Sequence, residues 1–324
     1  MFEFEKRLEL LAHVAAGYYV HGKNQQEIAN EIGMTRSAVS RLLSEAQKRG
    51  VVEHIIHYPW RTSPELEKEL AGRFDLLHVR VLARQNKNDE EMLQALGVLA
   101  AQYFTSLLPR LRVVGITWGT GLYQMIRAIQ PQSHPNLEVV QLIGGTGTEH
   151  GSAIGPLLAP MLANCLGCTC HFLHAPLVME NASARTSLVQ DRSIRATLQR
   201  AASCDIALTG IGGLLPEIYN PYRLGYITLD ELTAMRRDGL VGDVAALLYN
   251  LRGEILEDHW INRRIVGISA GTLKQIPMVL AVAGGAKKGE AIYGALRGRH
   301  VQALVTDDQA ALRVLALDQA SKDT

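Results

Sequence analysis

The sequence lacks several features that would place it in a specialised class of protein. It has only four cysteines in 324 residues, without disulfide-like spacing, and a net charge of +1 at neutral pH. No apolar run is long and charge-free enough to cross a bilayer, and charges interrupt the apolar pattern of the first twenty residues. We therefore expect a reduced, cytoplasmic protein with no signal peptide and no membrane partner.

The near-neutral charge excludes a global field that would draw the chain to nucleic acid, so any DNA affinity must come from a local patch, repeated by oligomerisation. No repeat or low-complexity segment occurs, and neither GxxxxGK[ST] nor a strand–GxGxxG–helix motif is present. The chain is 47% apolar and 20% charged, which describes a globular protein with an ample core. Its length predicts two domains, expected at residues 1–60 and 61–324.

A cluster of thiols and imidazoles invites a zinc hypothesis. Its members are Cys165, Cys168, Cys170, His171 and His174. Structural zinc needs four ligands that converge tetrahedrally, whereas successive residues of a strand point to opposite faces. We therefore expect no metal and no other cofactor, with the cysteines acting as small apolar side chains.

Residues 24–49 predict two short helices joined by a tight turn. Asn24 can cap the first helix, and Glu27 can close a capping box with it. Gly33 can adopt the left-handed backbone that ends this helix, and Thr35 can cap the next one. This is the pattern of a helix-turn-helix.

The second helix of this pair has two different faces. Val39, Leu42, Leu43 and Ala46 recur at helical spacing and predict the buried side. Small hydroxyls and basic residues on the other side suit the major groove of DNA. The expected DNA-contacting residues, including one at the start of the first helix, are Gln25, Arg36, Ser37, Ser40, Arg41 and Lys48.

The alternative is an ordinary helical hairpin with a solvated polar face. Residues 36–49 contain four basic residues and one acidic residue, a net charge of +3. A local basic stripe of this kind favours phosphate binding. A helix over 5–20 should support the pair, a strand over 51–58 would form a small wing, and prolines mark a linker near 58–64.

Beyond the linker, helical segments alternate with short apolar runs that are rich in β-branched residues. These expected strands lie within 77–82, 113–121, 137–147, 168–176, 205–213, 265–269, 277–285 and 303–307. Strands separated by helices imply a largely parallel sheet that is covered on both faces. The predicted fold is therefore an N-terminal all-α helix-turn-helix with a small wing, followed by an α/β domain.

Several of the expected strands end in glycine. At the carboxyl edge of a parallel sheet, glycine lets backbone N–H groups approach an anion at a helix N-terminus. Lys288 follows the last glycine pair by three residues. The residues that we expect to bind a phosphorylated or carboxylated ligand are Gly115, Thr117, Gly119, Thr120, Gly144, Gly145, Gly212 and Lys288.

Asp243 is the acid that stands nearest this edge, in the run LVGDVAALL. We interpret the residues after it as an apolar helix. Asp243 could then cap that helix, hold the hydroxyls of a sugar, or do both.

The chain resembles the SorC family of bacterial transcriptional regulators, sometimes grouped with DeoR-type proteins. The matching phrases cover nearly the whole length: QQEIANEIGMTRSAVSRLL, VGITWGTG, VVQLIGG, HAPLV, DIALTGIG, GLVGDVAALL, INRRIVGIS and AGGAKKGEAIYGALRG…LVTDDQAA. The resemblance implies operator DNA as a partner and an effector domain with a fold like that of ribose-phosphate isomerases and glucosamine-phosphate deaminases. It further implies a sugar or phosphorylated sugar effector and a homo-oligomer, either a dimer or a tetramer.

The same resemblance implies roles for particular residues. The phosphate-loop role falls on Gly115, Thr117, Gly119 and Thr120, the family's lysine on Lys288, and its acid on Asp243. Some relatives carry a lysine that reacts with a sugar aldehyde just before the second glycine pair. Here that position is Ile143, which argues against a covalent imine there. Two segments look particular to this chain and bear on the choice of sugar: 149–150 and 219–223.

Two functions of different classes follow from these observations. The first is a transcriptional regulator of a carbohydrate-use operon, gated by a sugar or sugar phosphate. The second is a sugar-phosphate isomerase or deaminase with an accessory DNA-binding domain. Such an enzyme needs an acid and a base positioned beside the sugar. Nothing in the spacing of the candidate residues demands such a set, so the sequence predicts a regulator with no catalytic residue.

Overall fold

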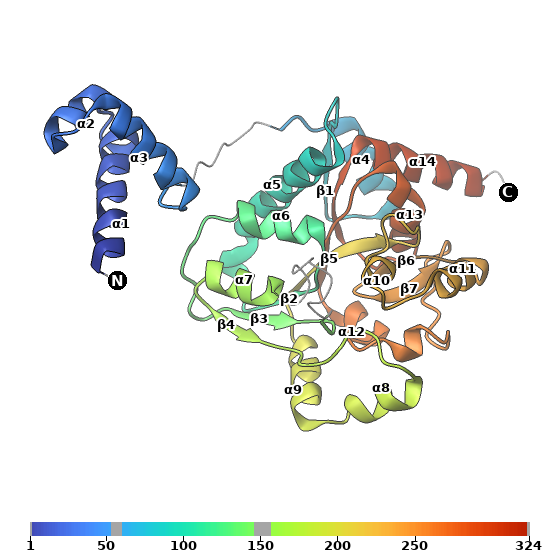
Figure 1. Ribbon diagram of the computed structural model, residues 1–324. Coiled ribbons are helices and arrows are strands. Elements are labelled where there is room, and N and C mark those ends of the chain that lie inside the picture. Colours follow the sequence, from blue (N-terminus) through green and yellow to red (C-terminus); the bar gives the residue numbers. More distant parts are fainter. Residues whose placement is uncertain (1, 53–59, 146–156, 323–324) are drawn as a thin grey trace. The chain divides into compact units, whose positions relative to one another are not determined.

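The computed structural model describes residues 2–52, 60–145 and 157–322, and the chain divides into two compact units, Met1–Pro59 and Trp60–Thr324. The first unit is helical (Figure 1). Its elements are α1 (Phe2–Ala15), a π-helical turn (Ala16–Val20), α2 (Gln25–Ile32) and α3 (Arg36–Lys48). A small core of its own holds these helices together, built on Leu11, Val14, Ile28, Val39 and Leu42.

The turn chemistry of the helix-turn-helix is confirmed. The Asn24 Oδ1 atom accepts hydrogen bonds from the backbone N–H groups of Gln26 and Glu27, both at 3.0 Å, and Glu27 Oε2 accepts from the Asn24 N–H at 2.8 Å. Gly33 ends α2 with a φ of +67°, and Thr35 caps α3 by accepting from the Ala38 N–H at 3.2 Å. These local bonds satisfy backbone donors that a helix leaves unpaired at its first turn.

The first helix differs from its prediction near its end. Its last turn is a π-helix, and the wider turn shifts the side chains that follow it around the axis. Tyr19, within this turn, is 39% exposed. The wing expected over 51–58 falls mostly on residues 53–59, which lie outside the described residues.

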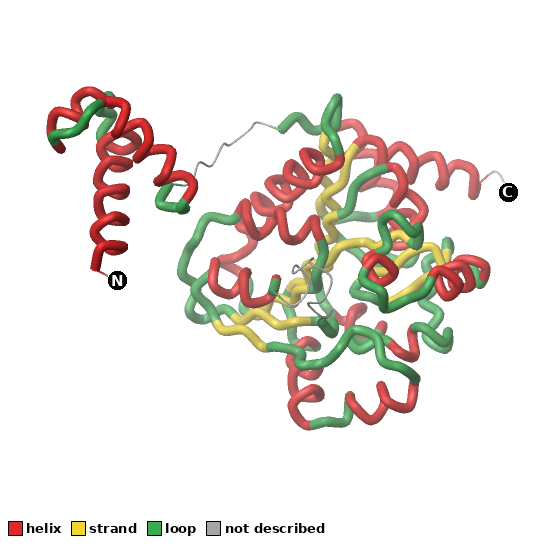
Figure 2. The backbone as a smooth tube through the Cα atoms, in the orientation of Figure 1, coloured by secondary structure: helices red, strands yellow, loops and turns green. Residues whose placement is uncertain are grey.

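The second unit is built on one large sheet (Figure 2). Seven strands pair in parallel, in the order β1-β9-β8-β5-β2-β3-β4. They are β1 (His78–Leu82), β2 (Val113–Ile116), β3 (Glu138–Gln141), β4 (Thr169–His171), β5 (Ile206–Gly213), β8 (Met278–Val282) and β9 (Ala303–Asp307). The largely parallel sheet predicted from the sequence is confirmed.

Helices cover both faces of this sheet, as the nearly continuous burial along its central strands requires. Side chains of α5 (Asp89–Leu107), α6 (Thr120–Ala128) and α7 (Leu158–Cys165) form the core on one face. Those of α4 (Pro64–Phe74), α11 (Leu229–Arg237), α13 (Gly289–Arg297) and α14 (Asp308–Lys322) form the core on the other. The remaining helices are α8 (Ala182–Leu188), α9 (Arg192–Ala201), α10 (Asn220–Arg223) and α12 (Ala270–Gln275).

The strand order has one point at which the chain changes direction across the sheet. From β2 the chain steps outward through β3 to β4, whereas from β5 it steps the opposite way through β8 to β9. The neighbours β2 and β5 therefore form a topological switch point, and their outgoing connections separate at the carboxyl edge. Ligands of open α/β sheets bind at such points, so the fold itself selects where to look for a site.

A hairpin that the sequence did not predict lies beside this switch point. The last residues of β5 extend past its parallel partners and pair in antiparallel fashion with β6 (Leu240–Val244), which turns back as β7 (Leu247–Asn250). The helix expected after Asp243 is therefore wrong, and Asp243 lies within β6. Two alanines form the turn, and alanine carries none of the usual hairpin signals.

Residues 185–202 fall in two helices, α8 and α9, because Asp191 accepts from the Ser193 N–H at 2.8 Å and starts a new helix. One further expectation needs correction. The segment 265–269 is no strand. Its residues make only isolated antiparallel β-bridges: Ile265 pairs with Val178, and Gly267 pairs with Ile143.

Candidate functional sites

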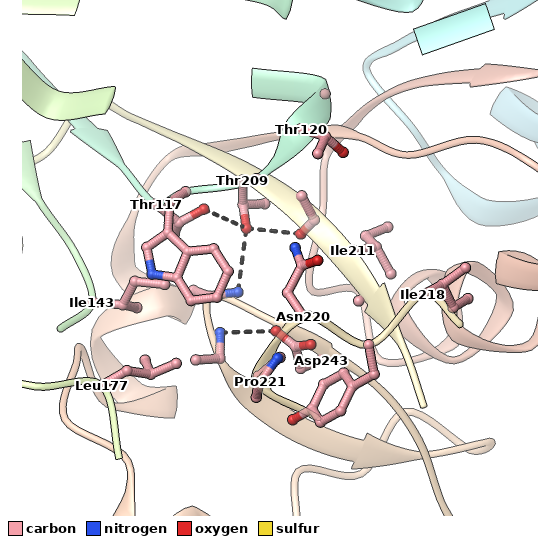
Figure 3. Close-up of a pocket in the computed structure, with 18 of the residues that line it drawn as sticks. Thr117, Thr120, Ile143, Leu177, Thr209, Ile211, Ile218, Asn220, Pro221 and Asp243 are labelled. Atoms are coloured by element: carbon pink, nitrogen blue, oxygen red, sulfur yellow. Dashed lines mark hydrogen bonds between the residues drawn. The ribbon is translucent and has the colours of Figure 1, made fainter. Parts of the chain in front are cut away.

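A pocket opens at the switch point, where the carboxyl ends of β2 and β5 meet the β6–β7 hairpin (Figure 3). The cavity has a volume of about 70 Å³, within an empty space of about 670 Å³ that includes its open mouth. Its lining comprises Thr117–Gly121, Ile143, Leu177, Thr209–Gly212, Ile218–Pro221, Asp243, Ala245, Ala246, Ile265, Val282 and Lys288.

Most of the expected effector residues meet in this lining, although they come from distant parts of the chain. Six of them line the pocket: Thr117, Gly119, Thr120, Gly212, Asp243 and Lys288. Gly115, Gly144 and Gly145 do not. Gly115 lies inside β2, where a Cβ atom would sit 2.7 Å from the Leu142 side chain, and Gly144 lies against the backbone of Pro176. These two glycines serve close packing below the pocket.

Asp243 is held by the hairpin that carries it. Its Oδ2 atom accepts a hydrogen bond from the Ala246 N–H at 3.1 Å, and its Oδ1 atom lies against Gly212 on the paired strand. A Cβ atom at position 212 would overlap Oδ1, so a larger residue there would displace the Asp243 carboxylate. Burial raises the pKa of Asp243 to about 6, while that hydrogen bond and the nearby positive charge of Lys288 act in the opposite direction.

Positive groups face the same pocket. The Nζ atom of Lys288 donates to the Ile211 carbonyl at 2.8 Å, which leaves two of its three N–H groups for other acceptors. Burial lowers the pKa of Lys288, and Asp243 counters that shift. Gly119 is the N-cap of α6 and offers no side-chain cap, and the pocket is lined by Gly119, Thr120 and Gly121 at this helix N-terminus. This combination suits an anion.

Two threonine hydroxyls hold the floor of the pocket together. Thr117 Oγ1 donates towards Leu208 O and Thr209 Oγ1, both at 3.4 Å. Thr209 Oγ1 donates to Gly210 O at 2.9 Å and accepts from the Ala245 N–H at 3.2 Å. Figure 3 shows these bonds linking β2, β5 and the hairpin turn. Their role is to fix the shape of the site.

The hairpin turn itself is strained. Ala245 and Ala246 have φ angles of +49° and +61°, in the left-handed region that alanine rarely adopts. Both line the pocket. Their N–H groups donate hydrogen bonds to Thr209 Oγ1 and Asp243 Oδ2. The strained turn therefore positions two side chains of the site.

The other candidate site is the outward face of α3. Arg36, Ser37, Ser40, Arg41 and Lys48 are all exposed, and Gln25 is half-buried at the start of α2. Glu45, the one acid of α3, is paired with Arg7 and with Arg49. Among the described residues, Arg36, Arg41 and Lys48 form no ion pair, and their charges are available to a phosphate backbone.

The thiol and imidazole cluster is divided between elements. Cys165 ends α7, while β4 carries Cys170 and His171. The His171 Nε2 atom pairs with Glu138 at 2.7 Å, and burial raises the pKa of all three cysteine thiols of the cluster. Within the described ranges, no group of three or more His, Cys, Asp or Glu side chains could hold a metal ion.

Sequence reasoning missed several residues of the pocket. Thr209 stands just before a glycine run that the sequence marks, yet nothing local shows that its hydroxyl bonds to the hairpin. Trp118 lies within the quoted glycine turn and donates from Nε1 to Gly144 O at 3.2 Å. Asn220 lies in a segment singled out as particular to this chain. Glu149 and His150, singled out with it, lie outside the described residues.

The two sites define a class of protein: a chain in which a DNA-reading helical unit precedes a small-molecule-binding α/β unit. No described helix is both long and apolar enough to span a membrane. Comparison with known families agrees with this division. Residues 9–58 match the Crp-like helix-turn-helix domain, and residues 58–316 match the family described as "Putative sugar-binding domain".

Similar proteins are found over nearly the full length. The transcriptional regulator LsrR of Enterobacter sp. (strain 638) is 33% identical over 311 residues, covering 95% of this chain and 93% of that protein. The deoxyribonucleoside regulator of Bacillus subtilis (strain 168) is 28% identical, and the match covers 94% of this chain and 97% of that protein. The full-length sorbitol operon regulator SorC from Klebsiella pneumoniae has a similar structure, with a TM-score of 0.71, 26% identity, and 95% and 99% covered.

The chain belongs to the SorC family of transcriptional regulators. It is a DNA-binding transcriptional regulator whose larger unit belongs to a sugar-binding domain family. The predicted family and the two-part fold are confirmed, and the relatives named above are regulators, which decides between the two functions in favour of the regulator.

Proposed function

We propose that the chain regulates a carbohydrate-use operon, and that a phosphorylated sugar bound in the switch-point pocket changes its affinity for operator DNA. The observation that carries this proposal is the pairing of opposite chemistries in one small pocket. Lys288 and the N-terminus of α6 offer an anion site, while the Asp243 carboxylate can accept hydrogen bonds from hydroxyls. A phosphate joined to a polyol has both groups.

For DNA, the proposal uses the exposed face of α3, with Arg36, Arg41 and Lys48 on phosphates and Ser37, Ser40 and Gln25 near base edges. The whole chain carries a charge of only +1, so one copy offers few phosphate contacts. A homo-oligomer, a dimer or tetramer, would present several copies of α3 to a symmetric operator and raise the affinity. The site of action would be the cytoplasm.

The division of labour can be tested with two single variants of the full chain. Binding to a DNA fragment from upstream of its own operon is measured by fluorescence anisotropy over a range of salt concentrations. Binding of a panel of pentose and hexose phosphates is measured by thermal shift, since a ligand of the native state raises the melting temperature. Arg41→Ala should weaken DNA binding and lower the salt slope by about one unit, leaving the thermal shift intact.

Lys288→Ala should do the reverse. We expect a smaller thermal shift with every sugar phosphate and unchanged DNA binding in the absence of ligand. If Arg41→Ala reduces both activities equally, the proposed separation of the two sites is wrong. If no sugar phosphate raises the melting temperature of the wild-type chain, the proposed effector class is wrong.

A further inference from the structure

Asn220 is a polar side chain in the pocket, and its amide has no hydrogen-bond partner among the described residues. A side-chain amide can donate two hydrogen bonds and accept two. No described group bonds to the Asn220 amide, although neighbouring polar side chains such as Thr209 and Asp243 are engaged. Asn220 is half-buried in the lining, and Figure 3 shows its amide directed into the pocket. A ligand that fills the pocket must pair with this amide or leave it desolvated and unsatisfied.

The backbone around Asn220 is firmly anchored. Tyr219 before it is 2% exposed, and Pro221 after it is buried. The Tyr219 N–H donates to Leu215 O at 2.9 Å, and the Asn220 carbonyl accepts from the Leu224 N–H, also at 2.9 Å. The backbone that carries the amide is therefore fixed before any ligand arrives, so only the side-chain torsions of Asn220 lose freedom when it forms a hydrogen bond.

The surroundings of Asn220 give its amide a particular chemical role. Ile211, Ile218 and Pro221 line the pocket with apolar surface. The ionised Asp243 carboxylate can only accept, and the Lys288 ammonium can only donate. The hydroxyls of Thr117 and Thr209 already donate within the protein. The Asn220 amide can both donate and accept, which matches a hydroxyl or carbonyl group of a neutral part of the ligand.

We propose that Asn220 determines specificity by hydrogen bonding to a hydroxyl or carbonyl oxygen of the sugar, at a different point from the anion site. The inference rests on the proposed function and adds a requirement to it. The effector is then a sugar phosphate with an oxygen substituent at the position that lies next to Asn220. An analogue that lacks this oxygen binds more weakly. The proposal involves no covalent bond between the protein and the sugar.

The test compares sugar phosphates with their deoxy analogues on the full chain. The probes are ribose 5-phosphate with 2-deoxyribose 5-phosphate, glucose 6-phosphate with its 2-, 3- and 4-deoxy analogues, and inorganic phosphate. Affinities are measured by calorimetry for the wild type, Asn220→Leu and Asn220→Asp. In the wild type, one hydroxylated probe should bind about 3- to 10-fold more tightly than its deoxy analogue, as one hydrogen bond provides.

In Asn220→Leu the ratio of the affinities for the hydroxylated probe and its deoxy analogue should fall to about one. The affinity for inorganic phosphate should stay within about twofold of the wild-type value. Asn220→Asp keeps the shape but adds a carboxylate, so it should weaken every phosphorylated probe. Asn164→Ala, on the exposed surface of α7, is the matched control and should change nothing. The melting temperature of each variant verifies that it is folded.

The possible failures are distinguishable. If the wild type discriminates between the probes and Asn220→Leu discriminates equally, the role of Asn220 is wrong and the proposed function stands. If both Asn220 variants bind every probe as the wild type does, the conclusion is the same. If Lys288→Ala also binds every probe as the wild type does, or the wild type binds none, the proposed function fails and this inference fails with it.

Discussion

At the scale of single residues, Asp243 lines the pocket, where its ionised carboxylate is destabilised by burial. Asp243 is half-buried in the lining of the pocket, and burial raises the pKa of its carboxyl group to about 6. Between its unfolded pKa, near 4, and this folded value, the native state binds more protons than the unfolded state. The free energy of unfolding therefore falls as the pH rises through this window, and above it the ionised carboxylate destabilises the protein fully.

Asp243→Asn should consequently be more stable than the wild type at pH 8, by on the order of 2 kcal/mol. The amide oxygen can still accept from the Ala246 N–H. The difference should shrink as the pH falls through 6 and vanish near pH 4, where the wild-type carboxyl is neutral. Urea unfolding of the larger unit at several pH values measures this, with the exposed Asp258→Asn as the control. A difference independent of pH would contradict the argument.

Gly212 makes a second residue-scale prediction, because Asp243 occupies the space where a side chain would begin. Gly212→Ala should lower the free energy of unfolding by about 1–3 kcal/mol, the usual range for overpacking. Equilibrium unfolding measures the loss. In an Asp243→Ala background the same substitution should cost much less, because the clashing Oδ1 atom is gone. Strictly additive effects in this double-mutant cycle would show that the two residues do not compete for the space.

At the scale of elements, the β6–β7 hairpin stores strain beside the pocket. A two-residue hairpin turn with positive φ at both central positions normally contains asparagine or glycine. Here alanine occupies both positions, and each is expected to cost roughly 1 kcal/mol. The turn persists because its two N–H groups are bonded to Thr209 and Asp243 and because the flanking strands are paired.

Ala246→Gly should therefore raise the stability of the protein, by up to about 1 kcal/mol, since glycine adopts this backbone without steric strain. The measurement is the urea midpoint of the larger unit. Ala316→Gly is the matched control, because Ala316 is exposed inside α14 and the same change there should lower stability by about 1 kcal/mol. Equal losses in the two variants would mean that the turn holds no strain.

At the scale of the whole molecule, each of the two units has its own core and its own expected ligand. The Asn24 capping box belongs to the smaller unit and the switch-point pocket to the larger one. We expect two calorimetric unfolding transitions. Asn24→Ala should lower only the transition of the smaller unit, by about 1 kcal/mol of stability. A bound sugar phosphate should raise only the transition of the larger unit. A single transition that responds to both changes would contradict this.

The charge of the molecule is also arranged at this scale. Although the whole chain has a net charge of only +1, the exposed surface of α3 is basic, because its one acid, Glu45, is paired with two arginines. Arg7 of α1 pairs with Glu45, so the tertiary packing of the smaller unit neutralises the one negative charge of α3. The sequence indicated the basic stripe, but only the packing showed which residue compensates the acid.

The sequence by itself determined the features that depend on chain neighbours. The capping box, the glycine that ends α2, the buried stripe of α3 and the parallel character of the sheet were predictable, because caps, turns and side-chain periodicity act over a few residues. The Asp243 segment misled for the same reason. Its apolar run fits a helix locally, and only pairing with the end of β5 makes it a strand.

Only the tertiary structure decided which residues share the pocket. The switch point places the ends of β2 and β5 side by side, although about ninety residues separate them in the chain. Thr209 then meets Ala245, Gly212 meets Asp243, and Asn220 enters the same space as Lys288. Gly115 and Gly144, which read like binding glycines, pack beneath the pocket. Such contacts depend on strand order and close packing, and no local pattern of residues encodes them.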